Sequence, residues 1–246
     1  TGWQQQMNSA PRLWGVFRSG LHYASVRLVP KLFPGVFFLL ILPVRLCAFV
    51  NGDRQVWWQG TLEKSLAPSW ALYLGHELRY GNDLRHLNLG RIDGGLMYRF
   101  SRVAACAVGY KQVCRESGAS TWQTVYIPTM DWWFYWRGRV LSVTWQSKFE
   151  YQFPAGEANT PVDRNKITLA RVRTWSTLPV QPFVAAELFY YFRDRQVQIR
   201  RLFIGFHYAP PQAFIRATLQ YLANQTATAS GWLTCHTLVV GLKCSF

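Results

Sequence analysis

Apolar and polar residues alternate along most of the chain after residue 53. The clearest case is residues 141–153. Successive side chains of a β-strand point to opposite faces, so this pattern predicts a strand with one apolar and one polar face. At about 3.3 Å per residue, such a strand is long enough to cross a thin membrane core even when tilted. Its apolar face holds Ser147 together with Leu141, Val143, Trp145, Phe149, Tyr151 and Phe153.

Ten further stretches alternate in a similar way, and no segment shows convincing helical periodicity. Turns rich in glycine, proline, asparagine or aspartate separate several of them, as at residues 81–83 and 154–156. The sequence therefore predicts an all-β fold without a second domain or solenoid repeats. The ten stretches are 55–64, 70–80, 91–100, 103–113, 122–127, 166–175, 180–192, 196–208, 213–222 and 232–246.

The strand count follows from how such a fold would close. A closed antiparallel barrel with both ends on one side of a membrane needs an even number of strands. We interpret residues 121–136, where Pro128 and a run of aromatic residues blur the alternation, as hiding one more strand. The prediction is a closed antiparallel up-and-down transmembrane β-barrel of about 12 strands, formed by residues 49–246, with 10 strands as the alternative.

The last predicted strand ends on an aromatic residue. Leu238, Val240, Leu242, Cys244 and Phe246 share one face of residues 237–246. This ending resembles the C-terminal strand of outer-membrane barrels of Gram-negative bacteria. The resemblance implies that Phe246 is an assembly signal for the outer-membrane barrel assembly machinery, and that the chain resides in the bacterial outer membrane.

Residues 1–48 contain five basic and no acidic residues and end in an apolar run at 32–42. This composition favours a cleaved secretory signal peptide, and the residues before Met7 are interpreted as an upstream extension of the gene model. Two alternatives stay open. One is a lipoprotein signal ending at Cys47, which Arg45 and Leu46 fit poorly, and the other is a retained segment.

Composition narrows the class of protein. The longest apolar run, 32–44, is interrupted by prolines and is too short for a transmembrane helix. The mean hydropathy of −0.04 and the 16% aromatic content suit alternating barrel strands with interfacial aromatic residues. The net charge is +15, yet no nucleic-acid-binding motif accompanies it. We therefore expect membrane lipid and lipopolysaccharide as partners, and no nucleic acid.

Several short segments, taken in order, resemble a bacterial outer-membrane barrel family catalogued as domain of unknown function 2490. The resemblance extends from about Trp57 to Phe246. It departs from the family pattern at residues 146–150, where the family favours Arg-x-Arg-x-Glu. It implies an outer-membrane barrel and supplies no activity, substrate or catalytic residue. The segments that carry it are 77–80, 95–98, 108–110, 148–150, 171–173, 187–189, 200–205 and His236.

If the apolar faces point outward, the opposite faces place many charges inside the barrel. Charges held inside a narrow barrel must be paired or hydrated. The pattern therefore predicts a ladder of interior salt bridges with a structural role, or else an arginine-lined path for anions. The predicted ladder consists of Glu77, Arg79, Arg91, Asp93, Arg99, Lys148, Glu150, Glu187, Arg201 and Arg216, with Glu63 and Lys243 on the same faces.

Two other classes of function are retained as alternatives. An outer-membrane lipid hydrolase would need a serine beside a histidine base; Ser142 and Ser147 are the candidate nucleophiles, and no motif frames either. A soluble ligand-binding β-barrel would need polar outer and apolar inner faces. No motif for catalysis, a metal or a cofactor is present, so we expect no enzyme activity and no cofactor.

Overall fold

The computed structural model describes residues 54–81, 84, 86–117, 121–172, 179–210 and 214–246. The predicted leader, residues 1–48, lies outside these ranges. The described residues form strands and turns. No helix long and apolar enough to span a membrane occurs among them. The strands are β1 (Arg54–Ala67), β2 (Trp70–Gly81), β3 (His86–Arg99), β4 (Ala104–Ser117), β5 (Thr121–Arg137), β6 (Leu141–Pro154), β7 (Thr160–Arg171), β8 (Val180–Tyr191), β9 (Gln196–Tyr208), β10 (Ile215–Thr228) and β11 (Gly231–Ser245).

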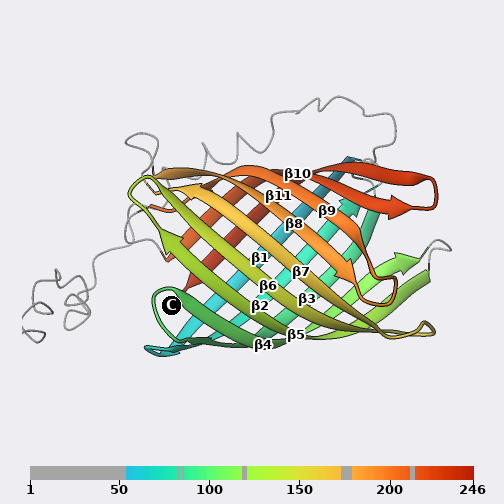
Figure 1. Ribbon diagram of the computed structural model, residues 1–246, viewed down its shortest axis with the longest axis horizontal. Coiled ribbons are helices and arrows are strands. Elements are labelled where there is room, and N and C mark those ends of the chain that lie inside the picture. The colour runs from blue at the N-terminus through green and yellow to red at the C-terminus, as the bar shows by residue number, and fades with distance from the viewer. Residues whose placement is uncertain (1–53, 82–83, 85, 118–120, 173–178, 211–213) are drawn as a thin grey trace, which may run out of the picture. The chain divides into compact units, whose positions relative to one another are not determined.

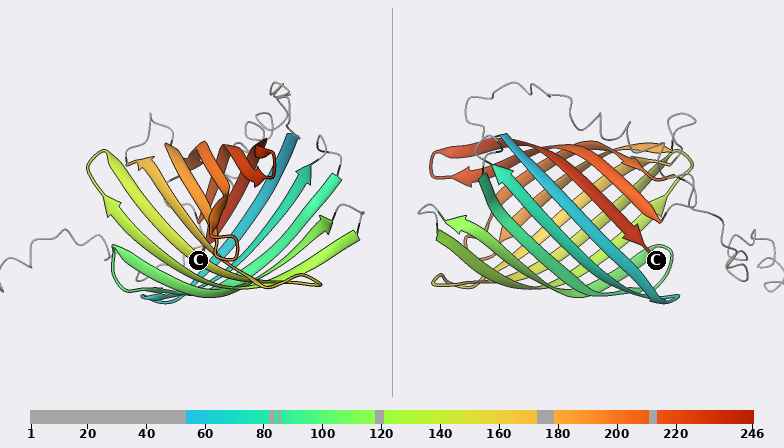
Figure 2. Two further views of the ribbon diagram at one scale, coloured as in Figure 1. Left: turned by 45° about the vertical axis from the view of Figure 1, so that its right-hand side comes forward. Right: turned by 180° about the vertical axis from the view of Figure 1, so that it is seen from behind.

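These strands form one closed barrel, as expected (Figures 1 and 2). Each strand pairs antiparallel with the next along the chain, whereas β1 and β11 pair in parallel, from Arg54 beside His236 to Glu63 beside Ser245. The described part thus has eleven strands rather than the expected twelve or ten, and its closure is mixed. An odd number of strands that alternate in direction leaves the first and last running the same way, so they can meet only in parallel.

The additional strand expected within residues 121–136 does not exist. The stretch is one long strand, β5, which pairs with β4 without interruption from Thr121 to Phe134. Its pairing with β6 is interrupted between Tyr126 and Thr129, at the position of Pro128, which has no N–H to donate to a neighbour. The proline therefore weakens one ladder of hydrogen bonds without ending the strand.

The two ends of the barrel are distinct. We call the end that holds the start of β1 and the β2–β3, β4–β5, β6–β7, β8–β9 and β10–β11 connections the N mouth. The opposite end, the C mouth, holds the remaining connections and Phe246. The backbone N–H of Phe246 donates to Glu63 O, and its carbonyl accepts from Ser65 N–H, both at 2.9 Å.

The barrel wall is apolar outside and charged inside. In β6, Leu141, Trp145, Phe149 and Phe153 are exposed on the outer surface, whereas Glu150 is only 2% exposed and points inward. The same division runs through the other strands, because each has a two-residue period. Outer positions that are exposed include Leu72, Leu74, Ile92, Val108, Met130, Ile167, Val184, Leu188, Leu202, Ile204 and Leu219.

The interior is not uniformly polar. Buried apolar side chains from β1 and β8–β11 pack together and fill one sector of the barrel. The cluster consists of Trp57, Phe183, Ala185, Phe203, Leu222 and Val239. Tyr73 occupies another sector, where its phenol lies against Gly95 and Gly109, which are paired directly across β3 and β4. The barrel therefore has little room for a wide aqueous channel.

Candidate functional site

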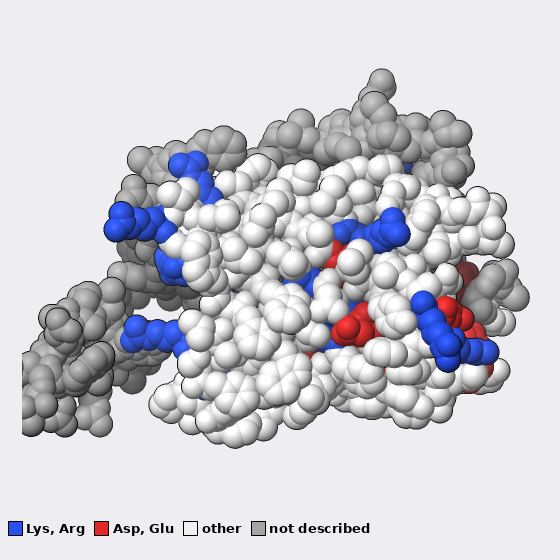
Figure 3. Space-filling model, viewed as in Figure 1, with Lys and Arg blue, Asp and Glu red and all other residues white. Residues whose placement is uncertain are grey.

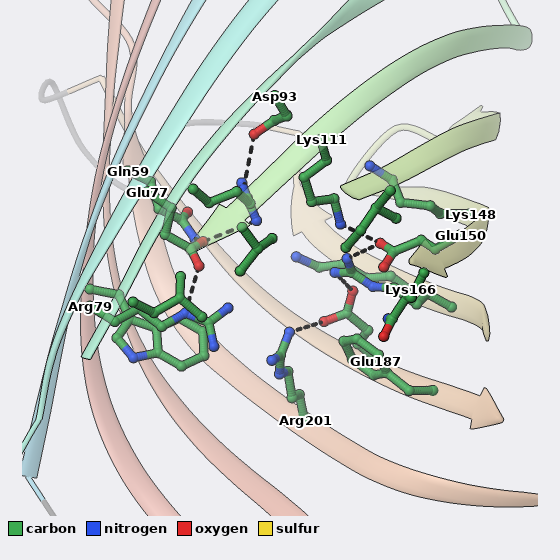
Figure 4. Close-up of a pocket in the computed structure, with 18 of the residues that line it drawn as sticks. Gln59, Glu77, Arg79, Asp93, Lys111, Lys148, Glu150, Lys166, Glu187 and Arg201 are labelled. Carbon is green, nitrogen blue, oxygen red and sulfur yellow. Dashed lines mark hydrogen bonds and ion pairs between the residues drawn. The ribbon is translucent and has the colours of Figure 1, made fainter. Parts of the chain in front are cut away.

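The interior charges form connected ion pairs around three buried glutamates (Figure 4). The first is Glu77 on β2, which is 1% exposed. Its carboxylate accepts from Arg79 Nε at 2.6 Å and Gln59 Nε2 at 2.5 Å, and lies 3.3 Å from Arg91 Nη1. Arg91 Nε in turn donates to Asp93 at 2.9 Å. Glu77 thus joins side chains from β1, β2 and β3.

Arg164 on β7 links the other two glutamates. Its Nη1 contacts Glu150 at 2.5 Å and its Nη2 contacts Glu187 at 2.8 Å. Glu150 also accepts from Lys111 Nζ at 2.6 Å, and Glu187 lies 3.2 Å from Arg201 Nη1. One guanidinium therefore connects β6 to β8, and its two glutamate partners contact β4 and β9. The planar fork of arginine suits this arrangement because it can donate in two directions at once.

Two smaller groups complete the network. Asp131, 1% exposed, accepts from Lys148 Nζ at 3.0 Å and from Gln146 Nε2 at 2.9 Å. Near the C mouth, Glu63 accepts from Arg99 and Lys243, each at 2.7 Å. These pairs keep each buried carboxylate in contact with a donor, as a charge removed from bulk water requires.

Most residues of the predicted ladder lie in this network. Glu77, Arg79, Arg91 and Asp93 meet on one side of the interior, Glu150, Glu187 and Arg201 meet on the other, and Lys148 and Arg99 have carboxylate partners. Arg216 does not join them. It is exposed near the C mouth, and no ion pair of the described residues includes it.

The sequence pattern missed Lys111, Asp131, Arg164 and Lys166 as interior residues. Arg164 was missed because the strand was expected to begin at residue 166, whereas β7 begins at Thr160. Asp131 lay in the stretch that Pro128 obscures. Lys111 shares its face of β4 with Ala105 and Ala107, which are buried inside the barrel. Because these residues are small and apolar, the face does not stand out in the sequence as a polar one.

A cavity of about 320 Å³ lies within the network. Basic side chains predominate among its described lining residues. The basic ones are Arg79, Arg91, Lys111, Arg115, Lys148, Arg164, Lys166 and Arg201, and the acidic ones are Glu77, Asp93, Glu150 and Glu187. The cavity therefore has an excess of positive charge, which favours small anions over cations.

Lys166 contributes to this excess differently from its neighbours. Its Nζ lies 4.2 Å from the ring centroid of Phe203, and no described carboxylate oxygen lies within 4.0 Å of it. The other basic residues that line the cavity each have a carboxylate within that distance. Lys166 is thus the interior cation best placed to interact with a mobile anion.

The described residues gather no metal-binding cluster and place no histidine on either candidate serine. They contain no group of three or more histidine, cysteine, aspartate or glutamate side chains that could hold a metal ion. Ser147 Oγ donates to Asp163 and Ser142 Oγ donates to the Ala170 carbonyl. No hydrogen bond between described residues joins either serine to a histidine.

A comparison of the chain with known protein families and with curated proteins finds no match.

Proposed function

We propose that this chain is a transmembrane β-barrel of the bacterial outer membrane. The observation that carries the proposal is the direction of the two faces: the outward faces of the described strands are mostly apolar and exposed, whereas the buried charges point inward. A soluble barrel would need the reverse arrangement. Apolar side chains on the outer wall are favourable against lipid and costly against water.

Aromatic side chains on the outer wall add support, because aromatic girdles mark the membrane–water interfaces of such barrels. Towards the C mouth, Trp70 packs on Tyr98, Tyr98 on Phe100 and Phe100 on Trp132. Towards the N mouth, the pairs are Tyr110 with Tyr126 and Phe149 with Phe192. Fractionation tests this part: a soluble periplasmic protein with no difference in gel mobility between boiled and unboiled samples would contradict it.

Within the membrane, we propose that the lumen is a narrow, anion-favouring path. Its support is the excess of basic side chains around the cavity. The side chains of these ion pairs occupy part of the lumen and so narrow the path, since they link β6 to β8 and β1 to β3 along the inner wall. Only small anions fit such a space.

Planar-bilayer recording is the direct test. The purified barrel in a salt gradient should show small conductances with a reversal potential on the anion-selective side. Lys166→Gln should move that potential towards zero, because it removes a lumen cation without breaking an ion pair between described residues. Arg139→Gln, an exposed substitution in the β5–β6 turn, is the matched control and should change selectivity less.

A structural barrel without conductance is the second candidate. The apolar cluster around Phe183, Phe203 and Leu222 favours it, because this cluster fills part of the lumen with apolar side chains that leave less room for a solute. Absence of conductance at any voltage, with lumen substitutions affecting only stability, would select this candidate over the channel. The resemblance to domain of unknown function 2490 stays a prediction under both candidates.

A further inference from the structure

A polar cluster interrupts the apolar surface of the outer wall on β6 and β7. Asp163 accepts from Ser147 Oγ at 3.4 Å and from Asn165 Nδ2 at 2.7 Å, and Trp145 Nε1 donates to Asn165 at 3.1 Å. All four share the outer face with Phe149 and Ile167, since each lies an even number of residues from them on its own strand. An ionisable group on a lipid-facing wall is costly and is a candidate functional site by default.

Asp163 forms no ion pair with the described basic residues. None of the described basic side chains has a nitrogen within 4.0 Å of its carboxylate. Its hydrogen bonds come only from neutral groups. The cluster therefore orients a carboxylate on the outer surface without neutralising it.

A basic residue lies on the same wall, on the other side of β8. Arg200 of β9 is exposed, and its guanidinium carbon lies 4.1 Å from the ring centroid of Trp232. Asn165 pairs with Leu188 of β8, and Leu188 pairs with Arg200, so the acidic cluster and the arginine flank one apolar residue. The face drawn in Figure 3 is mostly uncharged and carries both acidic and basic side chains in its middle.

Asp163 and Arg200 lie at about the same depth, meaning the same position along the barrel axis. Because barrel strands tilt by about 35–45°, a row of paired residues changes depth by about one residue at each step to the next strand. The parallel register of β1 and β11 sets the direction of this change: from each strand to the next along the chain, the row of paired residues moves closer to the N mouth. Asp163 lies two residues closer to the N mouth than Asn165, and therefore lies at about the depth of Arg200.

We infer that two copies of this chain associate in the membrane through the wall centred on β8, with Asp163 of each copy paired with Arg200 of the other. A two-fold axis along the membrane normal brings each side of a patch against the opposite side of its copy. Charges of opposite sign at equal depth on the two sides of β8 are what this symmetry requires. Val184, Ala186 and Leu188 would lie near the axis.

The distances permit this pairing. Each strand of an eleven-strand barrel occupies about 33° of the circle, so the charged positions recede from the contact plane by only a few ångströms. An arginine side chain spans such a gap. The small side chain of Ala186 between Val184 and Leu188 lets the two walls approach closely. A second copy is the occupant that fits, because one surface supplies both the acid and its complementary base.

Charge reversal tests the pairing. The dimer, measured by light scattering in mild detergent, should dissociate at least about tenfold more readily in Asp163→Arg and in Arg200→Asp. The double variant should regain it, because the pairs form again with exchanged signs. Each variant must first show the gel mobility shift of a folded barrel. A folded parent protein that is monomeric, or a double variant that is no better than the singles, would overturn the inference.

Cross-linking in native membranes tests the axis. In a background without other cysteines, Leu188→Cys should form a disulfide-linked dimer, whereas Ile92→Cys, exposed on β3, should not. The inference rests on the proposed membrane location, and the outcomes separate the two. Membrane-bound protein without the Leu188→Cys cross-link contradicts only the dimer, whereas soluble protein contradicts the proposed function itself.

Discussion

At the scale of the residue, Arg164 makes the strongest prediction about the interior. It bridges Glu150 and Glu187, and its side chain is 16% exposed. Removing one partner of a buried ion pair leaves the other charge uncompensated and typically costs about 3–5 kcal/mol. Arg164→Met should therefore lower the free energy of unfolding by about 3 kcal/mol, measured by urea titration of the gel-shifted folded form.

Two comparisons make the result specific to the bridge. Arg164→Lys keeps the charge but cannot reach both glutamates with one planar fork, so its loss should be intermediate. Arg139→Met, exposed in a turn, should change the free energy of unfolding by at most about 0.5 kcal/mol. If Arg164→Met were no worse than Arg139→Met, the network would not stabilise the barrel.

Gly109 depends on the absence of a side chain. A Cβ there would meet the Tyr73 hydroxyl and, at 2.8 Å, the Gly94 carbonyl oxygen. Gly109→Val should therefore destabilise the barrel by about 2 kcal/mol through overpacking, again measured by urea titration. Gly90→Ala is the control, since its nearest neighbour would lie 3.9 Å away. Adding Tyr73→Ala should recover part of the loss; no recovery would mean that Tyr73 is not the obstacle.

The predicted ladder shows how far alternation in the sequence identifies single interior residues. Glu77, Glu150 and Glu187 were assigned to the interior from alternation alone, and each is at most 5% exposed. Arg164 was not, because alternation assigns a face only once the ends of the strand are known. Which charges pair depends on neighbours from other strands, and strand register is not encoded in the spacing of one strand.

At the scale of the element, the closing strand carries the next prediction. The Phe246 backbone makes two hydrogen bonds to β1, and its ring stacks on Phe214 at 5.9 Å. Deleting Phe246 removes these contacts from the seam between the first and last strands. We expect severalfold less barrel in the outer-membrane fraction, measured by fractionation and immunoblotting.

Two substitutions separate the contribution of the Phe246 ring to assembly from that of its backbone hydrogen bonds. Phe246→Tyr keeps an aromatic ring at this position and should assemble normally, whereas Phe246→Ala keeps only the backbone hydrogen bonds. Equal assembly of Phe246→Ala and Phe246→Tyr would show that the ring is no assembly signal. Normal assembly of the deletion would also remove the role proposed for the seam.

Element boundaries explain where the sequence-based strand pattern was and was not sufficient. Each of the eleven predicted stretches overlaps one observed strand, because the two-residue period extends over most of each strand. The predicted count of about twelve is close to the observed eleven, and it is one too high because it assumed an antiparallel closure. The closure depends on the pairing of β1 with β11, and their parallel contact has no local signature in either strand.

At the scale of the whole molecule, the charges at the two mouths differ. The exposed charged residues described at the C mouth are basic, whereas both signs occur at the N mouth (Figure 3). The C-mouth residues are Lys64, Arg102, Arg137, Arg139, Arg171 and Arg216, and the N-mouth residues include Arg115, Glu157, Arg193, Asp194 and Arg195. A basic rim attracts the phosphates of lipid headgroups, so this asymmetry should orient the barrel as well as anchor it.

Because the described barrel has an odd number of strands, its orientation in the membrane can be tested from the two mouths. The start of β1 and Phe246 lie at opposite mouths, so the ends of the barrel segment cannot both face the periplasm. If the terminal strand is recognised from the periplasmic side, the C mouth faces the periplasm and the N mouth faces outward. In a background without other cysteines, a membrane-impermeant maleimide should then label Asp194→Cys in intact cells. Arg139→Cys should be labelled only after the outer membrane is permeabilised, and the reverse pattern would show the opposite orientation.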